Sequence, residues 1–301
     1  MPKTGTSSIQ EFLHLNREIL ASRGIRYARF DDRLGSQFEL AATGRVAAGA
    51  AVTDESARLV LRLKAPGDEG TYVARYRDFL DAQLQSWTQD LFVASSEHIQ
   101  AWLHKRDMIE ALDAFLGTRF ESVRYVVYLR AQEDLLISSY SERIKRGETL
   151  DLEEHLTKRI KAADLNRIVG LWERAVGRDR LDVRLMTPDA LVGGDLLTDF
   201  CDIMGTARSG LEHPGRINTS LNRDEIFLRL KLNRWLSVRR RRDGEYNPLY
   251  FKTLDKLKKL TRCGNEPLVL TPEQRDRITA YHAQSNERLR ARRFPERSTL
   301  F

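Results

Sequence analysis

Four short segments rich in β-branched and aromatic residues, separated by long stretches with helical spacing of apolar residues, constrain the fold most strongly. The alternation of strand and helix patterns predicts an α/β fold with a parallel sheet covered by helices on both faces. The expected strands are Gly24–Phe30, Leu91–Ser95, Val123–Leu129 and Leu181–Met186. The expected helices between and around them are Thr6–Arg23, Tyr72–Trp87, Ile99–Leu116, Leu165–Val176 and Ala190–Met204.

The last third of the sequence carries helical periodicity alone. Thr271 is a good N-cap, followed by a proline at the first helical position and by Gln274 at the third, so a helix is expected to begin there. We expect residues 223–301 to be a helical C-terminal extension of one domain that covers residues 1–301. Residues 33–64 are rich in alanine and glycine, and Ala65–Gly70 reads as a loop or linker.

Length and composition set limits on the class of protein. A chain of 301 residues with 41% hydrophobic content can bury a large core. It has no apolar run near the roughly 20 residues that span a bilayer and no signal-peptide pattern, so a soluble cytoplasmic protein is expected, with peripheral membrane contact left open. Cys201 and Cys263 lack metal-ligand spacing, which predicts reduced thiols and no metal site.

The net charge of +7 is unevenly distributed. Arginines form a run over Arg239–Arg242 and cluster again over residues 288–293. Such clusters suit an anionic partner, and they also suit a solvated helix face. No nucleic-acid recognition module is visible, so nucleic acid is not an expected partner.

The first residues combine a lysine, a glycine and hydroxyl side chains directly before the first expected helix. Gly5 permits a turn in which backbone N–H groups converge, and Thr4, Thr6 and Ser7 add hydroxyl donors. A phosphate at this helix end would also meet the Lys3 ammonium group. The loop therefore predicts an anion site, with an ordinary helix N-terminus as the alternative. It is not a Walker sequence, because the lysine precedes the glycine.

A second candidate anion site follows the third expected strand. Arg130 ends that strand, and Ser138 lies about two turns into the next helix, roughly 9–10 Å along its axis. A phosphate held by a long guanidinium group could bridge this separation. Taken alone, Arg130 would suit a salt bridge and Ser138 a solvated hydroxyl.

Glu97 follows the second expected strand, where ligands of open α/β sheets collect. A partly desolvated carboxylate there would have a raised pKa and could act as a general base. A helix-capping or arginine-paired carboxylate is the alternative reading of Glu97. His98 is the second candidate for the base.

The segment Pro2–Ser7 and the pattern Tyr-Leu-Arg-x7-Ser-x-Tyr ending at Tyr140 resemble the PAPS-dependent sulfotransferases, in particular the bacterial, carbohydrate-type branch. Ile217–Asn222 and Ser285–Leu289 are also similar to segments of that family. The resemblance implies a P-loop-like three-layer fold and transfer of a sulfuryl group from PAPS to a hydroxyl of a glycan or glycolipid, with PAP as product and no metal.

The resemblance also assigns roles to the candidate residues. Lys3 would stabilise the leaving group, and the loop from Thr4 through Gly5 and Thr6 to Ser7 would hold the 5'-phosphate. Arg130 and Ser138 would bind the 3'-phosphate, which distinguishes PAPS from other nucleotides.

One departure from the family concerns a strand. In that family the phosphate loop follows a central strand, whereas Met1 stands directly before the loop here. If the missing strand belongs between Leu91–Ser95 and Val123–Leu129, these two would face each other across about 9–10 Å. We expect Met1 to be an internal methionine, and we expect a chain without the strand to be weakly active or inactive.

Two alternatives remain open. A non-catalytic PAPS- or nucleotide-binding protein would retain Arg130 and Ser138 without turnover. A P-loop kinase fits less well, because the lysine stands on the wrong side of the glycine and no Walker B context is visible.

Overall fold

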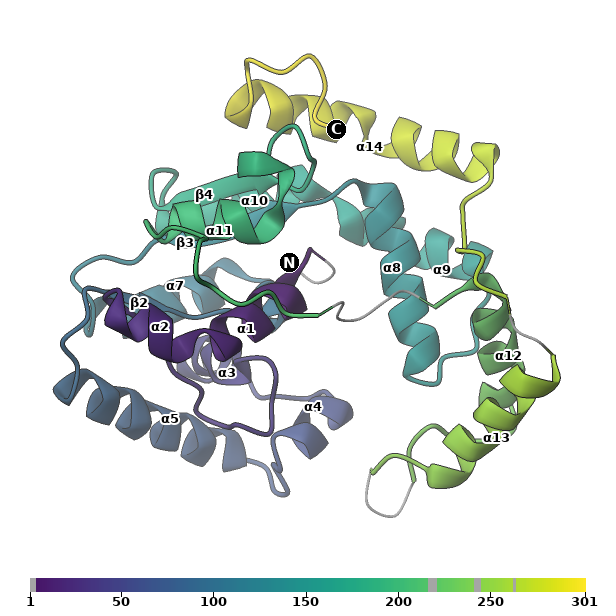
Figure 1. Ribbon diagram of the computed structural model, residues 1–301, viewed down its shortest axis with the longest axis horizontal. Helices are drawn as coiled ribbons and strands as arrows, with labels where there is room; N and C mark the ends of the chain where they lie inside the picture. The colour runs from purple at the N-terminus through teal and green to yellow at the C-terminus, as the bar shows by residue number, and fades with distance from the viewer. Residues whose placement is uncertain (1–3, 216–220, 241–244, 262–263) are drawn as a thin grey trace. The chain divides into compact units, whose positions relative to one another are not determined.

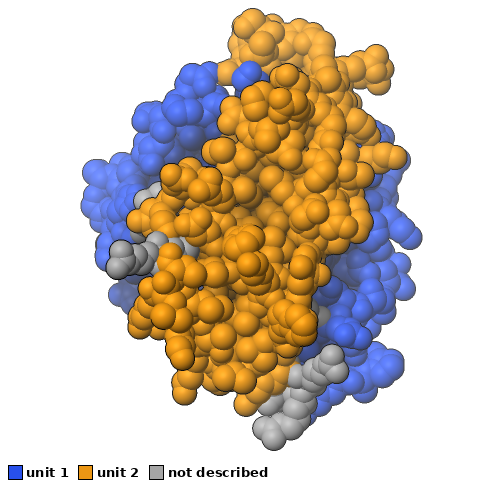
Figure 2. Space-filling view, turned by 90° about the vertical axis from the view of Figure 1, so that its right-hand side faces the viewer, with its two compact units in different colours: residues 1–130, 167–217, 301 blue, residues 131–166, 218–300 orange. Residues whose placement is uncertain are grey.

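The computed structural model describes residues 4–215, 221–240, 245–261 and 264–301. It is a mixed α/β structure that divides into two compact units (Figure 1). Unit 1 comprises residues 1–130, 167–217 and 301, and unit 2 comprises residues 131–166 and 218–300. Figure 2 shows the atoms of the two units in different colours. Each unit has its own buried hydrophobic clusters.

All strands of the described residues lie in unit 1, and each falls within a predicted segment. They pair in parallel as β1 with β2 and β3 with β4, in registers that place Ile25 opposite Leu91 and Tyr125 opposite Leu181. The sequence predicted one parallel sheet, but the described residues form two separate pairs, because β2 and β3 are not hydrogen-bonded to each other. The strands are β1 (Ile25–Tyr27), β2 (Leu91–Val93), β3 (Tyr125–Leu129) and β4 (Leu181–Leu185).

The helices of unit 1 cover these strands. Leu165 and Asn166, at the start of α10, belong to unit 2. The helices are α1 (Thr6–Leu15), α2 (Arg17–Ser22), α3 (Phe38–Ala47), α4 (Glu55–Val60), α5 (Asp68–Gln85), α6 (Glu97–Trp102), α7 (Arg106–Gly117), α10 (Leu165–Val176), the 3-10 turn η2 (Val192–Gly194) and α11 (Leu196–Ile203).

The predicted helix Thr6–Arg23 is interrupted at Asn16, which separates α1 from α2. The buried Asn16 amide donates to the Phe12 carbonyl at 2.8 Å and to the Glu212 carbonyl at 3.0 Å. Its oxygen accepts the Glu212 N–H at 2.7 Å. Because this side chain satisfies backbone groups from two segments, the chain can turn here without leaving buried polar groups unpaired.

Two helices lie where composition gave no helical prediction. Residues 33–64 are rich in alanine and glycine, yet they contain α3 and α4. Gly44 explains part of this composition, since a Cβ there would lie 2.7 Å from the Met108 carbonyl oxygen of α7. The glycine thus permits close packing of α3 on α7.

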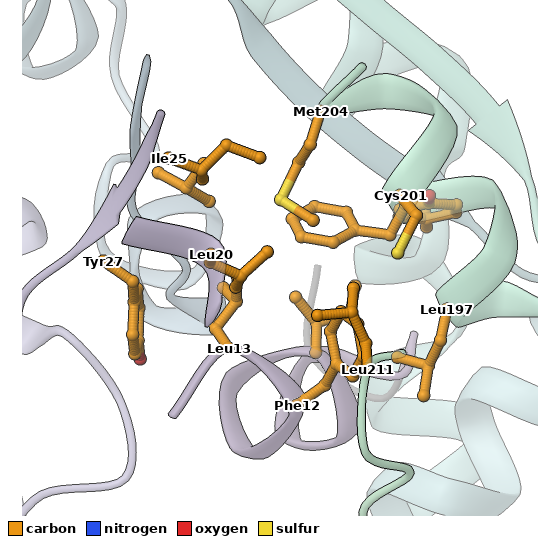
Figure 3. Packing of buried hydrophobic residues seen from close by; sticks show 13 residues of the cluster. Phe12, Leu13, Leu20, Ile25, Tyr27, Leu197, Cys201, Met204 and Leu211 are labelled. Carbon is orange, nitrogen blue, oxygen red and sulfur yellow. The ribbon is translucent and has the colours of Figure 1, made fainter. Parts of the chain in front are cut away.

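One core of unit 1 joins the first helices to α11 (Figure 3). Phe12, Leu13 and Leu20 are fully buried, and side chains from α11 and the strands pack against them. Cys201 belongs to this core. The amphipathic pattern that predicted α1 therefore reflects a real buried face.

The described part of unit 2 is helical, with two isolated β-bridges. Asn222–Pro267 is one of these bridges. The capping box expected at Thr271 is present, with Gln274 as its reciprocal partner and proline inside the first turn. The helices are α8 (Gln132–Lys145), α9 (Leu152–Arg159), η1 (Ile160–Ala163), α12 (Arg223–Asn233), α13 (Pro248–Leu260) and α14 (Pro272–Arg293).

Candidate functional site

The N-terminus of α1 has the geometry expected of an anion-binding loop. Gly5 is the N-cap residue with a φ of 78°, and its carbonyl accepts the Ile9 N–H at 3.0 Å. The N–H groups of Thr6, Ser7 and Ser8 precede this first helical bond and have no partner within the helix. The first turn contains no acidic side chain that would oppose an anion. Lys3 lies outside the described residues.

Strand ends surround this loop. Thr4 and Thr6 line the same cavity as Ser95 and Ser96, which follow β2. Gly5 lies beside Met186, which follows β4 and donates its N–H to the Leu129 carbonyl at the end of β3. The helix N-terminus is therefore close to the carboxyl ends of strands from both pairs, the usual location of ligands in α/β folds.

Helix α1 is also joined directly to the candidate base. Gln10, on the second turn of α1, donates its side-chain amide to Glu97 at 3.0 Å and to the Ser95 carbonyl at 3.2 Å. The Ser36 hydroxyl donates to the same Glu97 oxygen at 3.0 Å. Glu97 is the first residue of α6, whose N-cap is Ser96. The structure thus brings the predicted anion loop and the predicted carboxylate into one hydrogen-bonded arrangement.

The expectation of a raised pKa at Glu97 was wrong. Burial by itself raises the pKa of this carboxyl, but the neighbouring His98 charge and the hydrogen bonds from Gln10 and Ser36 outweigh that effect. The pKa of Glu97 therefore lies below its ordinary value. At neutral pH the group is an ionised acceptor and a weaker base than the sequence suggested.

His98 is held between the carboxylate and aromatic rings. Its Nε2 lies 3.5 Å from Glu97 Oε1, and its ring stacks on Phe38 with centroids 3.7 Å apart. The ring of Trp102, one turn further along α6, is tilted relative to the His98 ring, and the two ring centroids are 5.4 Å apart. The arrangement is a carboxylate–imidazole pair with an oriented ring, a pairing that can hold and move a proton.

Sequence reasoning missed three residues of this arrangement. Gln10 lies one turn after Ser7 on α1, so helical spacing alone could have placed it near the loop. Ser36 and Phe38 had no such signal, because they come from the segment of residues 33–64 whose composition indicated no helix. Their contacts with Glu97 and His98 are made by tertiary packing.

The predicted pair for the second phosphate is divided between the two units. Arg130 follows β3 in unit 1 and is half-buried. Ser138 lies on α8 in unit 2 and is also half-buried. Its neighbour Ser139 has its hydroxyl 2.9 Å from His155 Nε2, so the two adjacent serines occupy different surroundings on the helix.

The remaining predicted segments are partly described. Asn222 caps α12 by accepting the Glu225 N–H at 2.7 Å, and Ser285 donates to Asp164 at 2.6 Å. These contacts are structural. Cys201 is buried, which raises the pKa of its thiol, whereas Cys263 lies outside the described residues, as do residues 217–220 and 241–242.

No group of three histidine, cysteine or acidic side chains is arranged to hold a metal ion in the part of the chain that the structure describes. None of its helices combines the length and apolar character needed to cross a bilayer.

These observations define a mixed α/β protein with a helix N-terminus at the carboxyl ends of parallel strands, next to an ionised carboxylate–imidazole pair. Comparisons with protein families, with curated proteins and with solved structures found no match to this chain.

Proposed function

We propose that this protein is a PAPS-dependent sulfotransferase that transfers a sulfuryl group to a hydroxyl, with a glycan or glycolipid as the acceptor. One observation carries the proposal furthest. The N-terminus of α1 combines N–H groups that have no partner within the helix with a hydrogen-bonded link through Gln10 to the Glu97/His98 pair. An anionic donor and a proton acceptor can thus be held on the same side of unit 1.

In the reaction, the acceptor oxygen forms a bond to sulfur while the bond between sulfur and the bridging oxygen of PAPS breaks. PAP leaves with negative charge on that oxygen, and the acceptor hydroxyl loses its proton. Backbone N–H groups from Thr6 to Ser8 would hold the 5'-phosphate, with the Thr6 and Ser7 hydroxyls as further donors and Thr4 and Gly5 shaping the turn. Lys3 would stabilise the charge on the bridging oxygen.

We assign proton acceptance to Glu97 and His98 acting together. An ionised Glu97 stabilises the imidazolium ion that forms when His98 takes a proton, and the Phe38 ring fixes the orientation of the imidazole. Glu97 acting alone as the base is the simpler version. The two versions differ in the effect of His98→Gln, which should remove activity only if the imidazole takes part.

Selection of the donor would depend on the 3'-phosphate. The sequence pattern assigns Arg130 and Ser138 to that group, whose charge-assisted hydrogen bonds are about twice as strong as neutral ones. PAP should therefore raise the melting temperature far more than AMP, which lacks the 3'-phosphate. Equal shifts for PAP and AMP would remove this assignment.

Transfer itself is tested with labelled PAPS and a panel of glycan and glycolipid acceptors. Lys3→Ala should lower kcat roughly 10²–10³-fold with a smaller effect on PAP binding. A change in the Michaelis constant alone would make Lys3 a binding residue. A protein that binds PAP and transfers to no acceptor would instead be the non-catalytic binding protein, an alternative favoured by the absence of pairing between β2 and β3.

A further inference from the structure

The segment that contains α12 and α13, residues 223–260, carries the whole positive excess of the chain. In the sequence this α12–α13 region has twelve lysine or arginine residues and five aspartate or glutamate residues, an excess of +7. The full chain also has a net charge of +7, so the charges of all other residues balance. Positive charge gathered in one short region attracts an anionic surface or ligand.

The two helices form a folded support for these charges (Figure 1). The Tyr250 hydroxyl of α13 donates to Asn233 Oδ1 of α12 at 2.6 Å, and the Asn247 N–H donates to the Val238 carbonyl at 2.9 Å. These bonds join the end of α12, the segment after it and the start of α13. The buried side chains between the helices are Leu228, Leu232, Val238, Tyr250 and Leu254.

Large apolar side chains remain exposed on this support. Among the described residues, Trp235 at 88% and Leu260 at 70% are the most exposed of the large hydrophobic side chains. Half of the large hydrophobic side chains that are exposed in the described residues belong to the α12–α13 region, namely Phe227, Trp235, Tyr246, Leu249, Phe251 and Leu260. Such a concentration marks a surface that contacts another molecule or a membrane.

Helix α13 presents charged and apolar side chains on one face. Leu249, Lys252, Lys256 and Leu260 follow one another at intervals of three or four residues, and all four are exposed. These intervals place them on the same side of the helix, with two lysines between two leucines. Lysine can extend its charge to a headgroup while its methylene groups and the leucines lie in the apolar layer below.

Aromatic rings and cations also lie together before α13. Lys231 Nζ is 4.2 Å from the centre of the Phe227 ring, and the Arg239 guanidinium group is 4.3 Å from the centre of the Tyr246 ring. The Tyr246 ring in turn contacts the Phe251 ring edge-on at 5.6 Å. Aromatic side chains with an adjacent cation suit the headgroup level of a bilayer, where apolar and ionic surroundings meet.

The exposed leucines favour a lipid surface over a nucleic acid. A nucleic acid would bind the cations through its phosphates and would stack its bases on the aromatic rings, but it has no use for Leu249 and Leu260. An anionic bilayer engages all three kinds of side chain. Its phosphates attract lysine and arginine, its headgroup level accepts tryptophan and tyrosine, and its acyl boundary accepts leucine.

We propose that the α12–α13 region binds the surface of an anionic lipid bilayer, through its lysines and arginines together with its exposed aromatic and leucine side chains. The binding is peripheral and reversible, because it combines charge attraction with shallow insertion of a few apolar side chains. The inference does not depend on sulfuryl transfer, since it concerns where the protein binds and uses no residue of the candidate site.

The first test is sedimentation of the full chain with phosphatidylcholine vesicles that contain about 30% phosphatidylserine. Binding should be at least about tenfold weaker with pure phosphatidylcholine, and also in about 1 M salt, where the Debye length falls to about 3 Å. Trp235→Ala should weaken binding about tenfold, because burial of a large apolar side chain contributes at least that factor. Its melting temperature should be unchanged, since the side chain is almost fully exposed.

A pair of double variants separates a defined surface from general charge attraction. Lys252→Glu with Lys256→Glu alters α13, and Arg275→Glu with Arg288→Glu alters exposed positions of α14. Both variants change the net charge of the chain by the same amount. The α13 variant should bind the anionic vesicles at least about 25-fold more weakly, or about fivefold for each charge removed, and the α14 variant less than about fivefold more weakly.

Fluorescence locates the contact at Trp235. Vesicle binding should shift the emission of this exposed indole to shorter wavelength, and the difference from Trp235→Phe isolates its signal from the other tryptophans. Equal weakening by the two double variants, full binding by Trp235→Ala or an unshifted Trp235 emission would each overturn the proposal. Binding of single-stranded DNA or heparin without binding of vesicles would assign the region to a soluble polyanion instead.

Discussion

The Gln10 amide lies 3.0 Å from Glu97 Oε2 and so connects the helix that carries the anion loop to the helix that carries the candidate base. The same amide donates to the Ser95 carbonyl at 3.2 Å. Because one side chain contacts both the carboxylate and the backbone before it, Gln10 fixes the position of Glu97 relative to the first turn of α1. Activity and stability should therefore respond together when this contact is removed.

Gln10→Ala should lower the free energy of unfolding by about 1.5–3 kcal/mol, the range for a hydrogen bond to a charged group. The substitution should also change how the free energy of unfolding depends on pH in the acid range. The pKa of Glu97 is low in the folded protein, so its contribution to stability is present above the ordinary value of 4.5 and is lost as pH falls below it. Removing the Gln10 donor should reduce this loss.

Urea unfolding of the parent chain, Gln10→Ala, Glu97→Gln and the double variant, at pH 7 and pH 3.5, measures both effects. Additive changes in the free energy of unfolding at pH 7 would show that the contact contributes nothing.

Gly5→Ala should destabilise the fold for two reasons that a control can separate. Alanine is disfavoured by about 1–2 kcal/mol in the left-handed conformation, and its Cβ would lie 2.1 Å from Leu196 Cδ2. Gly67 is also a left-handed N-cap, with a φ of 89°, and has nothing within 4 Å of its Cβ position. Thermal unfolding of Gly5→Ala and Gly67→Ala should show the larger loss at Gly5, and equal losses would mean that Leu196 moves aside freely.

Asp199→Asn should cost about 3–5 kcal/mol, as expected when one partner of a buried ion pair is removed. The fully buried carboxylate accepts the Tyr128 hydroxyl at 2.6 Å and an Arg184 N–H at 2.7 Å. Asp202 lies 3.9 Å from the same arginine, but its side chain is 57% exposed. Asp202→Asn should change the free energy of unfolding by less than about 1 kcal/mol. Chemical denaturation of the two variants checks this contrast.

The stability of unit 2 should fall on mild acidification. Burial lowers the pKa of His155 to about 4, below its ordinary value of 6.5. Between these pH values the unfolded chain binds a proton that the folded chain does not, so the free energy of unfolding decreases as pH falls through that window. The pKa of the buried His282 is lowered as well and adds to the slope.

His155→Gln should make the unfolding free energy less dependent on pH between pH 6.5 and 4. The comparison is made by denaturant unfolding at several pH values. An unchanged slope in His155→Gln would assign the acid sensitivity to other groups.

Local sequence patterns were sufficient to place the strands but not their pairing. The four strands found among the described residues lie inside predicted segments, since β-branched and aromatic density marks buried strands well. The helix break at Asn16 was missed, because the residues that stabilise it include Glu212, which is remote in sequence. Helix α3 was missed because its glycine serves contact with α7, a tertiary reason that single-sequence patterns do not reveal.

The sequence predicted which residues form the candidate site better than it predicted the charges and pKa values within it. The sequence pointed to the loop at Gly5 and to Glu97, and the structure brings α1 and α6 together through Gln10. The sequence could not supply the direction of the Glu97 pKa shift, because the shift depends on a hydrogen-bond donor from α1 and on Ser36. The expected proximity of Arg130 and Ser138 stays a prediction.

The parallel strand pairs have a consequence for how the chain folds during synthesis. Ile25 pairs with Leu91, and Tyr125 pairs with Leu181. Neither pair of strands can therefore form until the long helical segment that connects its two strands has been synthesised. Such non-local contacts slow folding. While they form, the open edges of β2 and β3 are templates for strands of other chains. Expression yield should therefore depend on temperature and on chaperones more than the helical content of the native protein would suggest.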